Sequence, residues 1–380
     1  MQLDFFTLYV VIVTLSASLC AIWGTLAWQY AGFAPARTWF LAALTSAAGG
    51  GLMPFQSGIY APLVAAAANG LIVLAFWLFY TGLRQLHGAR TGIAVPLGAS
   101  AVSVALTLAL FHNVEFTALH YALGQMAPMF AMLHFLFSGR HRSAGSVVAG
   151  GGLLLGLIGH GVVVGMNLVI LSWIGPTPDW SAAAALTMVC VIFSGLLLNF
   201  GFAVLTIDHL RGEIEDIANR DALTGALNRR GFAARIATKA MRGAKAHGIL
   251  LIDLDGFKAV NDRFGHAAGD ECLVHLVRVV TAQLRANDIV TRLGGDEFCV
   301  VLWNASVEDC TRRASGIQAA LQDSPLLFQR QSLRVRCSIG TSIWDVASGM
   351  SAMEAIAHAD EAMYARKARR KPVPVEAVHG

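Results

Sequence analysis

The sequence predicts two parts of different fold class: an α-helical transmembrane bundle of about seven helices, then a cytoplasmic α/β domain with a central, mainly antiparallel sheet flanked by helices. Two observations predict the first part. The composition is 56% hydrophobic and only 14% charged, too apolar for one soluble globule, and no lysine precedes Asp208. One observation predicts the second part: from about Asp221, helical stretches alternate with short β-rich runs.

Seven apolar segments in the first part are long enough to cross a bilayer. A spanning helix needs about 20 mainly apolar residues, because each residue rises 1.5 Å through a hydrocarbon core about 30 Å thick. The segments between them contain Gly, Pro and polar residues, which are typical of loops. The predicted spans are approximately 5–28, 38–55, 59–83, 92–111, 116–138, 146–173 and 182–206. The second span is rich in glycine, and a re-entrant segment is the alternative for it.

The charged residues of this part predict its orientation, because Lys and Arg accumulate in short cytoplasmic loops. Loops one, three and five contain all its arginines: Arg37, Arg84, Arg90, Arg140 and Arg142. The N-terminus and the other loops contain only Asp4, Glu115 and Asp179. This pattern places the N-terminus outside and the C-terminus in the cytoplasm, which requires an odd number of spans.

Polar residues inside the predicted spans are candidates for ligand, metal or proton binding, namely His120, His134, His160 and Asn167. Hydrogen bonding between neighbouring helices is the alternative for each. The six cysteines form no C-x-x-C pair, so neither a disulfide framework nor a zinc site is indicated. The net charge of +4 forms no polybasic block, and no nucleic-acid partner is expected.

A short amphipathic segment, residues 207–220, follows the last span. Its apolar residues at 207, 210, 214 and 217 have the 3, 4, 3 spacing of a coiled-coil seam. About two heptads do not decide between a dimerising stalk and a helix that packs on its own domain.

Two acidic positions in the second part are predicted to lie where strands end. Residues 249–252 are a buried-strand pattern that ends at Asp253, and two strand-like runs, 289–293 and 298–303, flank Gly294, Gly295, Asp296 and Glu297. The glycine pair supplies the positive φ angles of a tight hairpin. Carboxylates at an open edge are the ligands that Mg²⁺ prefers. A calcium loop is the alternative for the Asp-x-Asp-Gly segment, but its acidic spacing fails after Asp255 and a strand precedes it.

These residues lie in five ordered blocks that resemble the GGDEF family of diguanylate cyclases. Residues 294–298 read Gly-Gly-Asp-Glu-Phe, the motif that names the family. Residues 221–230 resemble its opening D-x-L-T-G-x-x-N-R-R, and residues 253–270 its D-x-D-x-F-K-x-x-N-D…F-G-H…G-D block. Residues 338–340 and 359–364 resemble its late strand and last helix. The domains expected are a transmembrane sensor (1–206), a helical stalk (207–220), a GGDEF domain (221–371) and a flexible tail (372–380).

The resemblance implies a reaction in which two GTP molecules become cyclic di-GMP and two pyrophosphates. It implies that Asp253, Asp296 and the Leu254 carbonyl hold Mg²⁺, with Mn²⁺ as the alternative metal. It also implies that Asp296 or Glu297 assists deprotonation of the 3′-hydroxyl, and the choice between them stays open. The implied catalytic residues are therefore Asp296, Glu297 and Asp253.

The same resemblance implies a set of substrate-binding residues. Asn261 and Asp270 would recognise guanine, Lys258 and Lys367 would contact the triphosphate, and Gly294 and Gly295 would let the backbone approach the nucleotide. Phe257 and His266 belong to the same matched block. The family usually has a Gly-Arg pair where this chain has Arg370 and Lys371. Lys371 keeps the charge but loses a bidentate fork, which puts the strength of the triphosphate contact in doubt.

A second site is implied by Arg285-Ala286-Asn287-Asp288, which matches the family's R-x-x-D inhibitory site at the family distance before Gly294. Arg285 can offer two parallel donors to guanine O6 and N7 of the product. Cyclic di-GMP is therefore expected both as product and as feedback inhibitor.

The resemblance predicts a homodimeric enzyme in the inner (cytoplasmic) membrane of a bacterium, in contact with membrane lipid. Each of two catalytic domains would hold one GTP, so that dimer geometry is a natural point of control. The rival hypothesis is a catalytically silent domain that binds GTP or cyclic di-GMP. Both hairpin carboxylates are present here, which favours the enzyme. A transporter or channel with a regulatory tail is disfavoured because the spans carry almost no charge.

Overall fold

The computed structural model describes residues 5–138, 143–172, 181–240, 246–369 and 377–378 of the chain. It divides into two compact units, Met1–Arg211 and Gly212–Gly380. Each unit has its own hydrophobic core.

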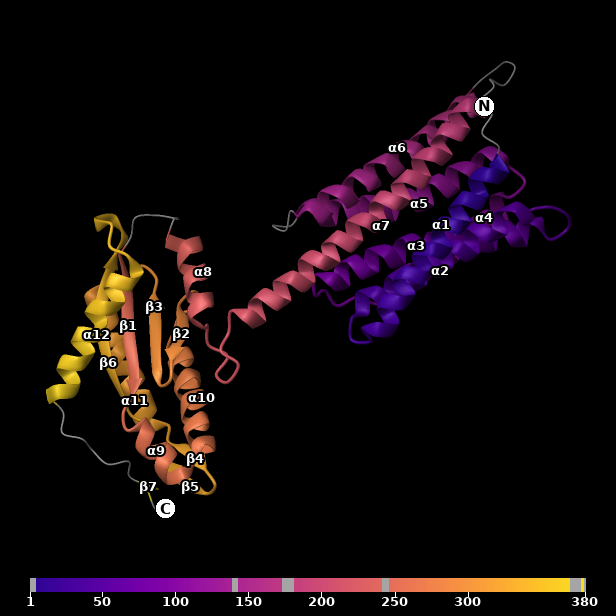
Figure 1. The fold of residues 1–380 in the computed structure, drawn as a ribbon. Coiled ribbons are helices and arrows are strands. Elements are labelled where there is room, and N and C mark those ends of the chain that lie inside the picture. The colour runs from indigo at the N-terminus through magenta and orange to yellow at the C-terminus, as the bar shows by residue number, and fades with distance from the viewer. Residues whose placement is uncertain (1–4, 139–142, 173–180, 241–245, 370–376, 379–380) are drawn as a thin grey trace. The chain divides into compact units, whose positions relative to one another are not determined.

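The first unit consists of long helices that pack along one another (Figure 1). In its described residues the bounds are α1 Phe5–Gln29, α2 Ala34–Leu52, the 3₁₀ turn η1 Met53–Phe55, α3 Ala61–Leu86, α4 Ala94–Leu110, α5 Val114–Ser138, α6 Ala144–Ser172 and α7 Ser181–Ala218. Pro35 and Pro62 begin α2 and α3, where the missing N–H costs no helical hydrogen bond. Pro128 lies inside α5.

Four of the helices in the described residues are long and apolar enough to cross a membrane: those that include Val10–Gln29, Ala61–Leu86, Ala144–Ser172 and Ser181–Ala218. The apolar helix Ala94–Leu110 is shorter. The prediction of seven spans therefore stays a prediction. Arg140, Arg142 and Asp179, on which part of the predicted orientation rests, lie outside the described residues.

An aromatic cluster forms the centre of this unit. The ring of Trp39 stacks on Phe202 with a centroid distance of 4.7 Å, and Trp23 packs against Trp39 at the same distance. Both indole N–H groups are satisfied: Trp39 donates to the Phe79 carbonyl and Trp23 to Asn199 Oδ1. Buried indoles require such partners, and here they connect helices that are far apart in the sequence.

Glycines bring α6 and α7 close together. A Cβ added at Gly201 would lie within 2.4 Å of the Ala149 backbone, and one at Gly152 would lie within 2.8 Å of the Leu198 backbone. Small residues at helix contacts are typical of membrane bundles, where close backbone packing replaces the hydrophobic driving force.

The polar residues singled out inside the predicted spans have different surroundings. His120 belongs to a buried polar cluster, because its Nε2 lies 3.3 Å from Ser103 Oγ and 3.4 Å from Asn69 Nδ2. His160 is buried, and Asn167 donates to the Val163 carbonyl of its own helix. His134 is exposed on the surface of the unit.

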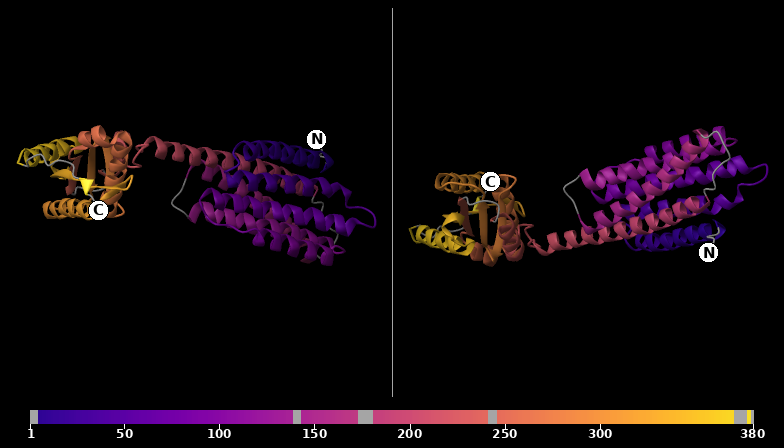
Figure 2. Two further views of the ribbon diagram at one scale, coloured as in Figure 1. Left: turned by 90° about the horizontal axis from the view of Figure 1, so that it is seen from below. Right: turned by 90° about the horizontal axis from the view of Figure 1, so that it is seen from above.

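The second unit is built on an antiparallel sheet, as predicted (Figures 1 and 2). Its strands have the order β2-β3-β1-β6, with β1 Ala246–Leu254 and β3 Glu297–Leu302 in the middle. The edge strands are β2 Ile289–Gly294 and β6 Cys337–Asp345. All three pairings are antiparallel.

Helices cover both faces of this sheet, which explains why β1 contains the continuous apolar run 249–252. Leu250 and Ile252 point to the face covered by α10 His266–Ala282 and α11 Val307–Asp323. Their neighbours Ile249 and Leu251 point to the opposite face, which packs against α12 Ala352–Arg369. Successive residues of a strand face opposite sides, so both sets are buried.

The remaining elements surround this core. They are α8 Arg229–Ala240, α9 Phe257–Phe264, the 3₁₀ turn η2 Val346–Ser348, and a small sheet of β4 Leu326–Phe328, β5 Gln331–Leu333 and β7 Ala377–Val378. β7 lies in the segment 372–380, for which a flexible tail was predicted, and it pairs with β5. The cysteines are free thiols, as expected. Burial raises the pKa of the Cys299 thiol to about 12, so it stays protonated and unreactive.

Candidate active site

A tight hairpin between β2 and β3 presents two carboxylates at its tip. Gly294 and Gly295 have φ angles of +155° and +52°, which residues with a Cβ rarely adopt. Gly294 pairs with Glu297, so that only Gly295 and Asp296 form the turn. The glycine pair therefore allows the sharp reversal that holds Asp296 and Glu297 at the edge of the sheet.

Asp253 lies beside this hairpin on the central strand β1. The register pairs it with Glu297 on one side and with Ser338 on the other. Burial raises the pKa of Asp253, the contact with Lys367 lowers it, and the negative charge of Asp296 raises it again, with a net rise. The predicted pair is therefore brought together, with Asp253 on β1 and Asp296 in the turn that precedes the neighbouring strand β3.

Lys367 on α12 forms an ion pair with Asp253, with a distance of 2.6 Å between Nζ and Oδ1. The Asp253 side chain is 15% exposed and that of Lys367 is 36% exposed, so the pair lies at the rim rather than in the core. The Lys367 ammonium thus partly balances the negative charge of Asp253, which the Asp296 carboxylate repels.

The position of α12 depends on two residues of the late strand and the last helix. A Cβ on Gly340 of β6 would lie 1.9 Å from the Ala359 carbonyl oxygen, so only glycine allows this approach. Arg366 donates from Nη1 to the Ile339 carbonyl at 2.9 Å. Arg366, the residue before Lys367, therefore ties α12 to the sheet.

Arg292 holds the hairpin and was not predicted from the sequence as a site residue. It donates from Nε and Nη2 to the Gly295 carbonyl, at 3.0 and 2.8 Å, and from Nη1 to both Asp221 oxygens. Burial raises the pKa of Asp221, but hydrogen bonds from Thr224 and the charge of Arg292 outweigh it, and the net shift is downward. The opening D-x-L-T motif thus serves as an anchor for the turn. An arginine two residues before the Gly-Gly pair was the signal available in the sequence.

A second group of predicted residues meets where α9 joins α10. Asn261 on α9 lies against Gly269 of α10, where an added Cβ would be 1.9 Å from Asn261 Oδ1 and 3.2 Å from the ring of Phe257. Asn261 Oδ1 is buried and has no hydrogen-bond partner among the described residues. Buried acceptors are normally paired, so the unpaired oxygen marks this junction as a candidate ligand contact. Asp270, the next residue after Gly269, is exposed.

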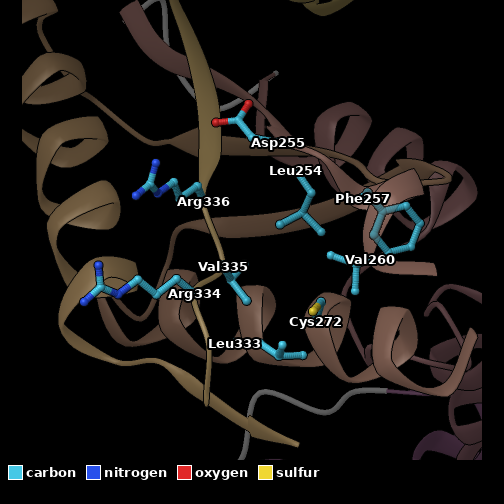
Figure 3. A pocket seen from close by; sticks show the side chains of 9 residues that line it. All are labelled: Leu254, Asp255, Phe257, Val260, Cys272, Leu333, Arg334, Val335 and Arg336. Carbon is cyan, nitrogen blue, oxygen red and sulfur yellow. The ribbon is translucent and has the colours of Figure 1, made fainter. Parts of the chain in front are cut away.

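A small depression lies beside this group (Figure 3). Leu254, Phe257, Val260 and Cys272 gather on its apolar side, whereas Arg334 and Arg336 point away from them. Its volume of about 10 Å³ holds one water molecule, not a nucleotide. The depression is therefore a packing feature behind the predicted substrate site.

The other predicted substrate residues are near these groups in the chain but differ in environment. Lys258 is exposed in the first turn of α9, and His266 is exposed at the start of α10. Lys371 lies outside the described residues.

The predicted inhibitory site forms a separate depression of about 40 Å³, which Arg285 and Asp288 line together with Arg312 and Arg313 of α11. Asp288 accepts hydrogen bonds from the backbone N–H groups of Arg285 and Trp303, at 3.0 and 3.1 Å. Its carboxylate therefore shapes the turn, while the exposed Arg285 side chain is the donor available to a ligand. The two arginines of α11 were missed because they lie far from the R-x-x-D motif in sequence.

The residues present fit a divalent cation at the hairpin. The carboxylates of Asp253 and Asp296 repel each other, and they lie where the β2–β3 hairpin turns beside β1. The Leu254 carbonyl directly follows Asp253 in the sequence. Oxygen donors of this kind suit Mg²⁺ or Mn²⁺. The described residues contain no cluster of three or more His, Cys, Asp or Glu side chains that could form a closed metal cage. A cation here would thus retain positions for phosphate oxygens.

Comparison with known families agrees with this geometry. The family model described as "Diguanylate cyclase, GGDEF domain" matches residues 218–372. Residues 218–372 are a GGDEF domain. Its homology to diguanylate cyclases is strong, and the helical unit that precedes this GGDEF domain has apolar helices consistent with a membrane sensor.

Two curated relatives illustrate the similarity. The chain is 40% identical over 156 residues to the diguanylate cyclase TpbB of Pseudomonas aeruginosa, which covers 40% of this chain and 35% of TpbB. It is 28% identical over 308 residues to the bifunctional diguanylate cyclase/cyclic di-GMP phosphodiesterase MucR of Pseudomonas aeruginosa, which covers 80% of this chain and 39% of MucR. The chain thus spans well under half the length of either relative.

A solved structure of the GGDEF domain of TpbB, also named YfiN, from Pseudomonas aeruginosa is 35% identical. The match covers 40% of this chain and 91% of that structure, with a TM-score of 0.36.

Proposed function

We propose that this protein is a membrane-anchored diguanylate cyclase that condenses two GTP molecules into cyclic di-GMP and two pyrophosphates. The single observation that carries the proposal is that Asp253, Asp296 and Lys367 lie together at the strand ends beside the β2–β3 hairpin. The two carboxylates can hold a metal ion and the ammonium can contact phosphate oxygens, so together they suit a metal-bound polyphosphate.

The proposed site holds Mg²⁺, or Mn²⁺ in its place, through Asp253, Asp296 and the Leu254 carbonyl. When bound there, such a cation neutralises charge on phosphate oxygens. Lys367 lies within ion-pair distance of Asp253, so its ammonium can turn toward a phosphate once another cation balances this carboxylate. Lys258 and Lys371 are proposed as further phosphate contacts, and His266 as a contact from the start of α10.

The proposed preference for guanine comes from the junction of α9 and α10. The unpaired Asn261 Oδ1 can accept a hydrogen bond from the guanine 2-amino group, which adenine lacks. The exposed Asp270 carboxylate can accept from guanine N1–H and N2–H. The ring of Phe257 lies beside the same glycine, 3.2 Å from the position of an added Cβ on Gly269. An ATP molecule would offer neither donor in this pattern.

In the proposed reaction, each 3′-hydroxyl oxygen attacks the α-phosphorus of the other GTP. A phosphorus–oxygen bond forms, the bond to pyrophosphate breaks, and the hydroxyl proton is lost to a carboxylate. Asp296 and Glu297 are both at the hairpin tip, and we propose that one of these two carboxylates accepts the proton. Gly294 and Gly295 leave the backbone of the tip free of side-chain bulk beside the nucleotide.

The reaction needs two half-sites, and we propose that a homodimer supplies them. The predicted seam of residues 207–220 supports this proposal, because Ile207, Leu210, Ile214 and Ile217 are 40–75% exposed along α7. Apolar side chains at heptad spacing on an exposed helix are suited to pairing with a second copy. The proposed organisation is a seven-span sensor (1–206), a stalk (207–220) and a cytoplasmic GGDEF domain (221–371).

We also propose feedback inhibition by cyclic di-GMP at the depression lined by Arg285. Two further arginines, Arg312 and Arg313, line the same depression. The proposed location is the inner membrane of a bacterium, with the N-terminus outside and with lipid around the helical unit.

Incubation of the protein with GTP and Mg²⁺ tests the proposal. Cyclic di-GMP and pyrophosphate in a 1:2 ratio are the expected products, and ATP should give none. If GTP binds but no cyclic product forms, the domain is a catalytically silent binding module, and the proposed enzyme function is wrong.

A further inference from the structure

A cavity lies inside the helical unit, among the helices that form its core. Its volume is about 380 Å³, which falls in the range of small-molecule binding sites, roughly 300–1,000 Å³. Residues from α1, α2, α3, α5, α6 and α7 line it. Such convergence of helices from the whole unit makes the cavity a central feature of the bundle.

The cavity wall is apolar except for a few uncharged polar side chains. Its apolar part includes Ile72, Phe76, Phe79 and Val191. Its polar part consists of Ser16, Ser46, Tyr121, Gln125, His160 and Asn199. No Asp, Glu, Lys or Arg is among the described residues that line it. A charged ligand would lack a counter-ion among these residues, so the wall suits a neutral ligand.

A hydrogen-bonded pair, His160 and Gln125, gives the cavity a defined polar point. His160 Nδ1 lies 2.8 Å from the Gly156 carbonyl, which can only accept, so Nδ1 carries the ring hydrogen. No carboxylate lines the cavity to balance an imidazolium, so the ring is neutral and Nε2 is an acceptor.

This tautomer determines what Gln125 offers to a ligand. Gln125 Oε1 lies 3.0 Å from His160 Nε2. Two acceptors cannot share a hydrogen bond, so the Gln125 amide must turn its NH₂ group toward Nε2 instead. The amide oxygen and nitrogen are interchangeable by a flip, which the hydrogen-bond network decides. The Gln125 carbonyl oxygen is then left in the cavity wall as an acceptor. By contrast, Asn199 already accepts from Trp23 and donates to the Gly195 carbonyl.

We infer that this cavity is a binding site for a neutral, mainly apolar small molecule that carries a hydroxyl group, held at its polar end by a hydrogen bond from that hydroxyl to the Gln125 carbonyl oxygen beside His160. The apolar wall accounts for the body of the ligand and the amide for its oxygen. Met188, Ile192, Gly195 and Asn199 of the wall belong to α7, so the ligand would contact the helix that continues to Ala218. The inference does not depend on cyclase chemistry.

Photolabelling of the full-length protein in lipid nanodiscs tests this inference without GTP. The probe is 4-(hydroxymethyl)benzophenone, a neutral alcohol whose ketone forms a bond to neighbouring C–H groups under near-ultraviolet light. Labelled residues are located by mass spectrometry. The competitor is 4-benzylbenzyl alcohol, which has a similar shape but no photoreactive ketone.

Two glycine-to-leucine variants form a matched pair. Gly195 lines the cavity and has open space around an added Cβ, so Gly195→Leu fills the cavity without a backbone clash. Gly161 also has open space but is exposed and is not among the lining residues, so Gly161→Leu is the control. Gln125→Met keeps the side-chain length and removes the hydrogen-bonding groups.

The expected result is saturable labelling of lining residues, such as Ile72 and Val191, that the competitor suppresses. Gly195→Leu should abolish it and Gly161→Leu should leave it unchanged. Gln125→Met should weaken the apparent affinity about fivefold, the effect of one net hydrogen bond. Competition in the wild-type protein keeps the test decisive if Gly195→Leu does not fold.

Labelling that is spread over lipid-facing residues and resists the competitor would overturn the inference. So would native mass spectrometry that finds one phospholipid bound to the wild-type protein and lost in Gly195→Leu, because the cavity would then hold an acyl chain. Cyclase activity enters neither measurement, so failure here leaves the proposed function intact.

Discussion

The substitution Gly340→Ala should disable the active site, although Gly340 lies on the edge strand β6 and not in the site itself. The added methyl group would lie 1.9 Å from the Ala359 carbonyl oxygen and 2.6 Å from the Met363 nitrogen. Both of these atoms belong to the backbone of α12, so rotation of a side chain cannot relieve the contact. The helix must move away from β6.

The size of this movement follows from the structure. Ordinary contact begins at 3.4 Å, so α12 must retreat by about 1.5 Å. Lys367 lies on the same helix, at 2.6 Å from Asp253, and would move with it. Overpacking of this kind costs about 1–3 kcal/mol of stability. Misplacement of a positioning group by about 1 Å can lower the rate 10²-fold.

Two measurements on residues 207–380 separate the effects. Urea unfolding gives the loss of stability, and the rate of cyclic di-GMP formation in GTP and Mg²⁺, well below the unfolding midpoint, gives the loss of activity. Gly316→Ala is the matched control, because an added Cβ there meets only Gln283 Oε1 at 3.6 Å. The control should retain both stability and rate.

Gly340→Ala with the wild-type unfolding midpoint and the wild-type rate would refute this reasoning. A loss of stability with an unchanged rate would show that α12 moves but that the position of Lys367 does not matter for catalysis.

Three further predictions concern charge. Lys367→Met removes the cation that lowers the pKa of Asp253. Because metal binding needs the ionised carboxylate, the pH below which activity is lost should move upward in a pH–rate profile. An unchanged acid limb of this profile would count against the ion pair. Arg285→Ala should relieve inhibition by added cyclic di-GMP with the uninhibited rate unchanged, and wild-type inhibition would remove that site. Burial lowers the pKa of His247, so the folded domain binds fewer protons there than the unfolded chain. Stability is therefore complete above pH ~6.5 and falls as the pH drops below it. His247→Gln, whose amide oxygen can still accept from the Asn304 N–H, should flatten this fall in urea unfolding, and an equally steep fall would contradict the assignment.

The sequence predicted the catalytic domain well, because its signals are local. The continuous apolar run in β1 and the Gly-Gly pair at 294–295 specify a strand and a hairpin within a few residues, and both are present. The antiparallel sheet is confirmed. The roles assigned to the individual site residues stay predictions.

Features that depend on tertiary packing were not predictable. The clamp of Arg292 between Asp221 and the Gly295 carbonyl joins residues 71 positions apart. Arg312 and Arg313 meet Arg285 only because α11 folds back beside it. In the helical unit, hydropathy predicts lengths of helix but not which faces meet, so the sequence singled out His160 but could not pair it with Gln125.

The rate of cyclic di-GMP formation by the full-length protein carrying Asp296→Asn tests the central claim most directly. The substitution keeps the size of the side chain and removes the charge that faces Asp253. Product formation from GTP should fall about 10³-fold, while urea unfolding stays close to wild type. Undiminished product formation by a folded Asp296→Asn protein would contradict the assignment of the hairpin as the catalytic centre.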